Sequence, residues 1–310
     1  MLREILINNC PINPTHSCQR IEHVPIEILL RAARRELQLD VDAELQGITA
    51  LERWSCLDCG LIFFTPWCPG GRVFYEKLGE HSWYQPASKW EYRCAAALLQ
   101  ETDRVLDIGC GDGRFHLSVT PAEYTGLDPN ATQPCRELSP VARIFSESLE
   151  QHAAAHPAAY DAVCAFQVLE HVSDPRGFVE AALRCLRPGG RLVFGLPNRS
   201  SYLGGLMNFA LDSPPHHLTS WNDGALQALE REVGISRVEL RQAPLEDWEC
   251  ELYWMQRCYR KWRPANQRYS AKARWAYLIP LCYLLAKVLA RTATAPQTVN
   301  GSTMLWVAER

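Results

Sequence analysis

The residues best suited to chemistry form a glycine-rich stretch that follows a predicted buried strand, 105–108. Three glycines follow Asp107 at every second position: Gly109, Gly111 and Gly113. Glycine lets the backbone approach a ligand closely and tolerates positive φ. The residues from Arg114 onward can begin a helix, whose first N–H groups would face a carboxylate or a phosphate. A strand, a glycine turn and a helix start together predict a cradle for a cofactor.

The spacing of these glycines and of a later acid indicates the kind of cofactor. A dinucleotide fingerprint needs G-x-G-x-x-G, and Arg114 occupies the position of its third glycine. Asp128 ends a second predicted strand, 123–128, and lies 19 residues after Gly109. A carboxylate there can accept hydrogen bonds from both hydroxyls of a ribose. A nicotinamide-dependent dehydrogenase is therefore disfavoured, and Asp128 either binds a nucleoside or only ends a strand.

The pattern D-x-G-x-G-x-G from Asp107 to Gly113 resembles the class I S-adenosylmethionine (SAM) dependent methyltransferases. The resemblance continues through 160–172 and the Pro-Gly-Gly turn at 188–190, and the stretch 146–163 looks much like the ubiquinone-biosynthesis O-methyltransferases. It implies that SAM is the cofactor and that Asp107, the three glycines and Asp128 belong to its site. Further cofactor contacts implied by the resemblance are Cys110, Ser148, Leu149, Phe166, Gln167 and Lys89. For Lys89, a plain packing role is the alternative.

Alternating strand and helix patterns predict an α/β fold. The resemblance implies a Rossmann-like seven-stranded sheet, mostly parallel and covered by helices on both faces, with an antiparallel last strand at 303–308. It also implies a zinc-ribbon-like N-terminal module at 1–85 and a methyltransferase domain at 86–310. Within that domain, a basic and apolar helical insertion is predicted at 249–298, before the last strand.

Cysteines of the N-terminal region predict a metal site. The sequence Cys56-Leu-Asp-Cys59-Gly60 has the form of a zinc knuckle, in which two thiolates on a tight turn share a tetrahedral ion. The other two ligands would come from residues near the N-terminus: Cys10, Cys18 or His16. The stretch 56–66 resembles the second half of a zinc-ribbon-like module found before some bacterial methyltransferase domains, but Asn13 replaces a cysteine of the first half. The predicted zinc ligands are Cys10, Cys18, Cys56 and Cys59, and the alternative is a relic knuckle held by packing.

Three histidines follow the C-terminal ends of predicted strands, where ligands bind in open α/β sheets. They are His171, His216 and His217. A hydroxyl acceptor loses a proton as it is methylated, so a general base would help the reaction. Each histidine is a candidate for this base, and each could instead order its own loop through hydrogen bonds.

The distribution of charged residues and cysteines indicates the cellular environment of the protein. The 310 residues carry a formal net charge of -3, yet nine Lys and Arg residues and no acid lie between Leu252 and Ala308. Basic residues beside the apolar run 275–290 are typical of a membrane-surface segment, although 16 residues fall short of a span. The alternative is a cap helix packed on the sheet. Thirteen irregularly spaced cysteines and the lack of a signal-peptide pattern predict a cytoplasmic protein, with peripheral membrane contact through 257–291 as an option.

The sequence therefore predicts a SAM-dependent methyltransferase that acts on a small-molecule or sugar acceptor, most simply at oxygen. Polysaccharide or specialised-metabolite biosynthesis fits the zinc-ribbon-like resemblance, and a lipid-linked glycan fits the basic, apolar segment. Nucleic acid is disfavoured because no binding motif is present, and the oligomeric state is not predicted. The competing hypothesis is a SAM-binding scaffold or regulator without turnover, whose cysteine module binds a partner.

Overall fold

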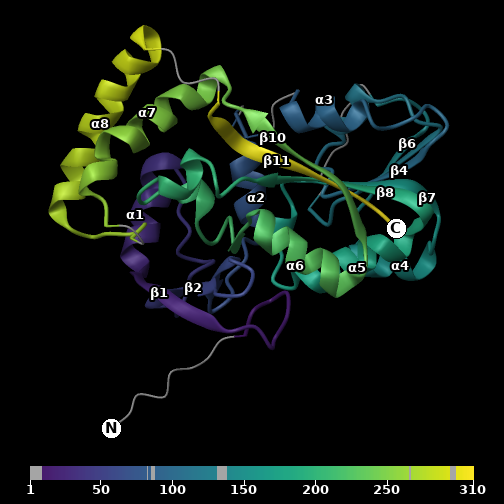
Figure 1. Ribbon diagram of the computed structural model, residues 1–310, viewed down its shortest axis with the longest axis horizontal. Helices are drawn as coiled ribbons and strands as arrows, with labels where there is room; N and C mark the ends of the chain where they lie inside the picture. Colours follow the sequence, from purple (N-terminus) through teal and green to yellow (C-terminus); the bar gives the residue numbers. More distant parts are fainter. Residues whose placement is uncertain (1–8, 82, 85–87, 131–137, 265–266, 294–297) are drawn as a thin grey trace. The chain divides into compact units, whose positions relative to one another are not determined.

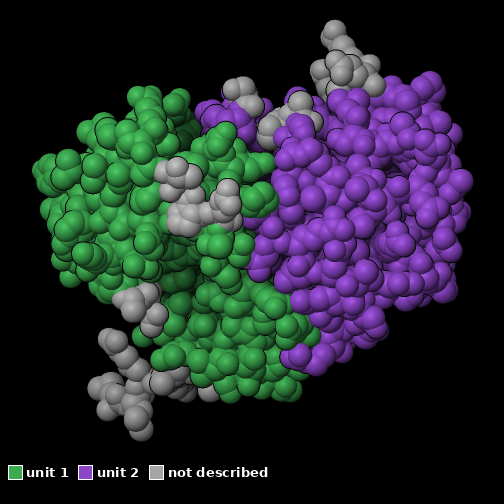
Figure 2. All heavy atoms as spheres, turned by 45° about the horizontal axis from the view of Figure 1, so that its top comes forward, with its two compact units in different colours: residues 1–70, 198–228, 244–302 green, residues 71–197, 229–243, 303–310 purple. Residues whose placement is uncertain are grey.

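The computed structural model describes residues 9–81, 83–84, 88–130, 138–264, 267–293 and 298–310 (Figure 1). The chain divides into two compact units, each built from segments far apart in sequence (Figure 2). Unit 1 contains residues 1–70, 198–228 and 244–302, and unit 2 contains residues 71–197, 229–243 and 303–310. The units therefore follow a different division from the predicted boundaries at 85/86 and at 249–298.

A seven-stranded sheet forms the centre of unit 2. Its strands are β4 (Arg104–Ile108), β5 (Glu123–Leu127), β6 (Ala142–Phe145), β7 (Tyr160–Phe166), β8 (Leu186–Pro197), β10 (Ser236–Pro244) and β11 (Asn300–Glu309). Their order is β10-β11-β8-β7-β4-β5-β6. Strands β4 to β8 pair in parallel, and β11 pairs antiparallel to β8. This confirms the predicted Rossmann-like sheet with its antiparallel last strand.

Helices lie on both faces of this sheet. Figure 1 shows α3 (Trp90–Ala96) on one face, with α4 (Leu149–Ala155) and α5 (Pro175–Cys185) on the other. Unit 2 also contains α2 (Arg72–Gly79) and the 3-10 helices η1 (Arg114–Ser118) and η2 (Leu169–His171), while α6 (Asp223–Val233) has its residues 223–228 in unit 1 and the rest in unit 2. Asp174 caps α5 by accepting a hydrogen bond from the Gly177 N–H, and Pro175 begins the helix, where no donor is lost.

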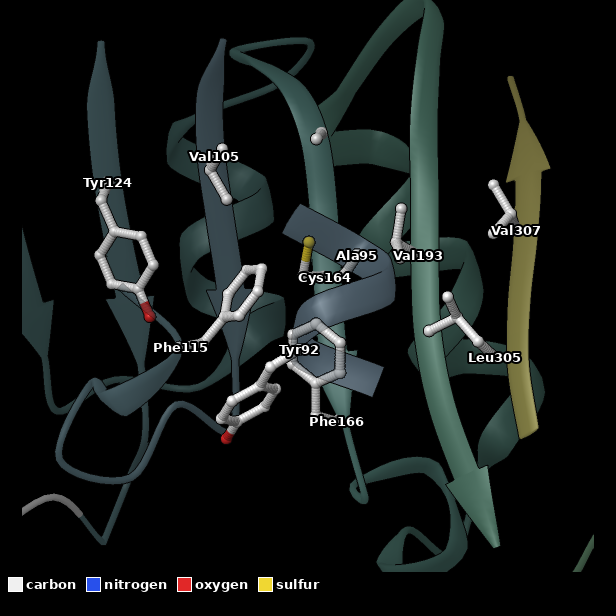
Figure 3. Close-up of a cluster of buried hydrophobic side chains, with 11 residues drawn as sticks. Tyr92, Ala95, Val105, Phe115, Tyr124, Cys164, Phe166, Val193, Leu305 and Val307 are labelled. Atoms are coloured by element: carbon white, nitrogen blue, oxygen red, sulfur yellow. The ribbon is translucent and has the colours of Figure 1, made fainter. Parts of the chain in front are cut away.

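An apolar cluster holds α3 against the sheet (Figure 3). Three aromatic rings form its lower part, and their centroids lie 4.9 Å apart for Tyr92 and Phe166 and 4.6 Å apart for Phe115 and Phe166. Val105 and Cys164 of the central strands are fully buried in the same cluster. Because β4 and β7 are covered on both faces, their apolar runs do not alternate with polar residues.

A second, four-stranded sheet belongs to unit 1. It contains β1 (Cys18–Pro25), β2 (Ala50–Cys56), β3 (Ile62–Thr65) and β9 (Thr219–Ser220), in that order and all antiparallel. Helix α1 (Ile26–Glu36) joins β1 to β2. Strand β9 comes from the 198–228 segment and pairs with β3. The N-terminal module is therefore completed by residues that follow the glycine loop in sequence, which explains why unit 1 is discontinuous.

The remaining elements of unit 1 are helical. They are η3 (Tyr202–Gly205), η4 (Ala210–Asp212), η5 (Asp247–Glu249), α7 (Cys250–Tyr259), η6 (Arg260–Trp262) and α8 (Ala273–Thr292). Figure 1 shows α7 and α8 side by side, and the rings of Tyr259 and Trp275 join them with centroids 5.7 Å apart.

Helix α8 corrects one expectation from the sequence. The apolar run 275–290 belongs to a helix of 20 residues with Pro280 inside it. Among the described residues, α8 is the one helix whose length and composition would allow it to cross a membrane. The argument that the run is too short was therefore wrong, because the flanking residues extend the helix.

Candidate functional site

The glycine loop follows β4 directly, and its backbone requires glycine. The φ angles of Gly109, Gly111 and Gly113 are 69°, 57° and 87°. A Cβ atom at Gly109 would lie 2.5 Å from a methyl carbon of Val168, and one at Gly113 would lie 2.8 Å from Ile144 Cδ1. Left-handed backbone and lack of space therefore both exclude larger residues at these two positions.

Hydrogen bonds attach the loop to the end of the neighbouring strand β5. The N–H groups of Gly109 and Cys110 both donate to the Leu127 carbonyl, at 2.7 and 3.2 Å. Asp128 Oδ2 accepts from the Gly111 N–H at 2.9 Å, and Oδ1 accepts from the Asn130 N–H at 2.8 Å. Since a carboxylate oxygen has two lone pairs, each can still accept a hydroxyl. Loop and carboxylate thus form one preorganised edge.

Asp107 has a different environment from Asp128. Its side chain is buried inside the sheet, and Oδ2 accepts a hydrogen bond from the Tyr124 hydroxyl. Burial raises the pKa of Asp107 to about 7, although the Tyr124 hydroxyl and the Lys89 ammonium oppose this shift. The structure therefore places Asp107 beneath the loop, where it positions the strand end.

The helix predicted after the loop is a short 3-10 helix and not an α-helix. Residues 114–118 form a single 3-10 turn, η1, which follows the left-handed Gly113. Phe115 packs into the apolar cluster, and the chain returns to extended backbone at Val119. A turn this short does not present the row of aligned N–H groups that an α-helix would offer to an anion.

The other predicted cofactor residues lie on neighbouring elements of unit 2. Ser148 caps α4 by accepting from the Gln151 N–H, and Leu149 begins that helix as a buried residue. Phe166 ends β7 in the aromatic cluster. Gln167 has a φ of 59°, unusual for a non-glycine residue, and its backbone N–H donates to the Gly195 carbonyl.

Lys89 immediately precedes α3, and its ammonium lies 5.3 Å from the centroid of the Tyr92 ring. Its positive charge also lowers the pKa of Asp107. The ammonium is therefore placed to act electrostatically on the loop region, and its cofactor contact stays a prediction.

Two tyrosines also belong to this region, and sequence reasoning did not assign them firmly. Burial raises the pKa of Tyr75 and of Tyr84, and the nearby carboxylates of Glu170 and Asp128 raise both further. The Tyr75 ring meets the His171 ring edge-on, with centroids 5.8 Å apart. The aromatic-rich run 74–84 was the available signal, but its spacing alone could not show which rings face the carboxylates.

The three predicted catalytic histidines are divided between the units. His171 lies in η2 of unit 2, whereas His216 and His217 lie in unit 1 with their rings stacked 4.5 Å apart. His217 Nδ1 lies 3.0 Å from Asp212 Oδ1, and His216 Nδ1 lies 2.8 Å from the Leu211 carbonyl oxygen. An Nδ1–H donor in each ring leaves Nε2 as the basic nitrogen of the neutral form.

Asp212 links His217 to a buried cation. Arg268 Nη1 donates to Asp212 Oδ2 at 2.7 Å, and both side chains are buried. Burial raises the pKa of Asp212, but Arg268 and His217 outweigh burial and hold the pKa at about 2. Asp212 is therefore ionised at neutral pH, and its carboxylate orients the His217 ring.

Unit 1 also contains the predicted metal ligands. One group has all of its ligand atoms within 4.8 Å of one another: Cys10, His16, Cys56 and Cys59. The Cys10 and Cys59 sulfurs are 3.8 Å apart, and Cys56 Sγ lies 3.6 Å from His16 Nδ1. Two thiolates bound at 2.3 Å to a tetrahedral ion would be about 3.8 Å apart. The donor types and spacing therefore fit zinc.

This group shares Cys10, Cys56 and Cys59 with the predicted ligand set and contains His16, the alternative to Cys18. Cys18 lies outside it, and its thiol donates to the His16 carbonyl oxygen at 3.9 Å. The knuckle itself has the expected form, because Gly60 takes a φ of 78° and the Cys59 N–H donates to Cys56 Sγ at 3.4 Å. His16 joins the group because the turn after Asn13 brings its ring to Cys56.

A family model described as a methyltransferase domain matches residues 69–240, more than half of the chain. The chain belongs to this methyltransferase family. The match agrees with the glycine loop, the acid after β5 and the strand order, and it confirms the predicted class I SAM-dependent family.

Curated relatives of this methyltransferase share part of its sequence. Two ubiquinone biosynthesis O-methyltransferases, from Pectobacterium carotovorum and Sodalis glossinidius, are each 39% identical over 106 and 109 residues. These matches cover 32% and 31% of this chain and 44% and 42% of the relatives. The chain thus spans less than half the length of these relatives. A SAM-dependent methyltransferase from Archaeoglobus fulgidus covers 76% of this chain and 100% of its own, at 18% identity and a TM-score of 0.48.

The residues of this methyltransferase fit SAM. Because Gly109, Gly111 and Gly113 have no side chains, a ligand can approach the loop backbone closely. The carboxylate of Asp128 beside the loop suits a ribose, and the Lys89 ammonium supplies a positive charge nearby.

We predict that Asp107→Asn flattens the pH dependence of stability. An Asp with a folded-state pKa of about 7 and an unfolded pKa of about 3.9 binds an extra proton in the folded state between these values. Its contribution to stability is therefore present at low pH and is lost as pH rises from about 4 to about 7. Melting temperatures of the ligand-free protein across this range measure the effect.

Tyr124→Phe provides the matched comparison. It removes the hydrogen bond that lowers the Asp107 pKa, so the loss of stability should extend to higher pH than in the wild type. Equal slopes for the wild type and Asp107→Asn would contradict the assignment.

Proposed function

We propose that this protein binds SAM at the glycine loop and transfers a methyl group to an oxygen of a small acceptor. The single observation that carries the proposal is the hydrogen-bonded edge formed by Gly109, Gly111 and Asp128. When bound, SAM supplies an activated sulfonium methyl group. The protein contributes chiefly position and orientation, because such a transfer needs the acceptor held in line.

Each part of the edge has a proposed role toward the cofactor. Asp128 accepts the ribose hydroxyls with the lone pairs that its two backbone donors leave. The loop backbone approaches the cofactor at Gly109 and Gly113, and Lys89 binds the methionine carboxylate. Ser148, Leu149, Phe166 and Gln167 border the remainder of the cofactor, as the family resemblance implies.

The proposed acceptor is a small hydroxylated molecule. The O-methyltransferase names of the curated relatives support oxygen as the atom methylated. A sugar or lipid-linked glycan in polysaccharide or specialised-metabolite biosynthesis is our finer proposal, resting on the resemblance of the N-terminal module. A non-catalytic SAM-binding scaffold is the alternative, and methyl transfer itself distinguishes the two.

The binding proposal is tested by titrating the protein with S-adenosylhomocysteine. We expect micromolar binding or tighter, about -8 kcal/mol, and at least about tenfold weaker binding for Asp128→Ala, which loses charge-assisted hydrogen bonds. Glu123→Ala is the matched control, because Glu123 lies at the opposite end of the same strand, β5. Folded wild-type protein that does not bind would refute the proposal. Transfer of labelled methyl from SAM to a panel of phenols and sugars would then exclude a pure scaffold.

We further propose that His217, oriented by Asp212, is the general base. His217→Gln should lower the methyl-transfer rate by about 10²–10⁴-fold and leave the affinity for S-adenosylhomocysteine unchanged. His216→Gln should cost less, because its Nδ1 partner is a neutral carbonyl instead of a carboxylate. A His217→Gln enzyme with an unaltered rate and pH profile would show that this histidine only orders its loop.

We propose that Cys10, His16, Cys56 and Cys59 bind one structural zinc ion. Purified protein should contain zinc, and Cys56→Ser should lose it and melt at a lower temperature. His16→Ala separates the observed group from the predicted one, because it should weaken zinc retention while Cys18→Ser should not. The reverse outcome would make Cys18 the fourth ligand, and a wild type without zinc would leave the knuckle as a packed relic.

A further inference from the structure

Helix α8 is apolar on two opposite sides, and α7 covers one of them. The covered side carries Trp275, Ile279, Cys282 and Ala286, spaced four, three and four residues apart. These residues share a core with Tyr253 and Tyr259 of α7. A helix that is apolar all round normally has apolar surroundings on every side.

The opposite side of α8 exposes large apolar side chains to solvent. They are Tyr277, Leu281, Leu284, Leu285 and Val288, which are 77%, 64%, 62%, 50% and 56% exposed. The spacing of four, three and four residues from Tyr277 to Val288 places these side chains in one stripe along the helix. Such a contiguous apolar stripe marks an interaction surface, unlike single exposed residues.

The segment 252–308, which contains this stripe, carries only positive charge, and Glu251, directly before it, is an acid that interacts with Tyr283 of α8. Of the nine basic residues between Leu252 and Ala308, Arg268 is buried on Asp212 and does not contribute to the surface. The others are exposed or half-buried: Arg257, Arg260, Lys261, Arg263, Lys272, Arg274, Lys287 and Arg291. The same segment has no acidic residue, and Trp262 is 55% exposed beside Lys261. Apolar residues, a tryptophan and cations together match the boundary between lipid tails and anionic headgroups.

We propose that this α8 surface docks on an anionic phospholipid bilayer, with the helix axis parallel to the membrane. The exposed stripe would enter the headgroup boundary, and the surrounding cations would contact lipid phosphates and carboxylates. Each basic residue near such a surface strengthens binding roughly fivefold.

Two other occupants fit the observations less well. A second copy of this chain would bring like charges together, because the segment offers no acidic side chain to pair with them. A membrane span would remove Trp275 and Ile279 from their contacts with α7 and immerse Lys287 in lipid. An anionic bilayer offers an apolar boundary to the stripe and negative headgroups to the basic residues.

Vesicle sedimentation tests the proposal on the intact protein. We expect binding to vesicles of phosphatidylcholine with about a third phosphatidylserine, and much weaker binding to phosphatidylcholine alone. Binding should fall when salt screens the cations. The double variant Leu281→Gln/Leu284→Gln should lose at least tenfold in affinity, and Lys261→Glu/Lys272→Glu should lose a similar factor. All four positions are exposed, so these changes should not unfold the protein.

Matched controls come from unit 2. Val238→Gln removes an equally exposed apolar residue, and Arg231→Glu reverses an exposed charge, so both should bind like the wild type. Circular dichroism and S-adenosylhomocysteine binding should be unchanged in all variants, which separates this proposal from the cofactor site.

Three outcomes would overturn the proposal. Equal, salt-insensitive binding to neutral vesicles would remove the role of charge. Protein that resists extraction by high salt and alkaline carbonate would indicate a span. Self-association that the Leu281→Gln/Leu284→Gln variant abolishes, without vesicle binding by the wild type, would identify a second copy as the occupant.

Discussion

The cofactor edge depends on one shared acceptor, the Leu127 carbonyl at the end of β5. Two successive N–H groups of the glycine loop donate to it, and the Gly111 N–H of the same loop donates to Asp128. These bonds require the loop to turn sharply after β4, which only left-handed backbone permits. Sequence and backbone angle are therefore one constraint, because a side chain at Gly109 would strain the turn and collide with Val168.

Each unit buries an aspartate side chain, and the two aspartates have different partners. Asp107 has a hydroxyl partner and the Lys89 ammonium, but burial outweighs both and raises its pKa. Asp212 has a guanidinium and an imidazole in direct contact, so it stays ionised despite equal burial. A buried ion pair contributes little net stability, but removing one partner is costly. The Asp212–Arg268 pair therefore fixes the geometry of the 198–228 segment, to which His217 belongs.

The sequence predicted the architecture better than it predicted the local partners. Strand runs such as 105–108 and 160–166 are continuous and apolar, so periodicity and order were sufficient to infer the sheet. Spacing alone could not choose between His16 and Cys18, because that choice depends on how the turn after Asn13 is closed. It also could not place Tyr75, whose neighbours Glu170 and Asp128 are remote in sequence, and the predicted cofactor roles remain predictions. The length of α8 was missed because Ala273, Arg274, Arg291 and Thr292 continue the helix beyond the apolar run 275–290.

The interleaving of the two units has a consequence for biosynthesis. Strand β11 lies between β8 and β10 in the sheet, yet the ribosome makes it only after residues 244–302 of unit 1. Until then the nascent chain exposes the edge of β8, and β3 has to wait for β9. Neither unit can finish as an independent domain in the usual N-to-C order. Newly made chains should therefore present unpaired strand edges until β9 and β11 have been synthesised.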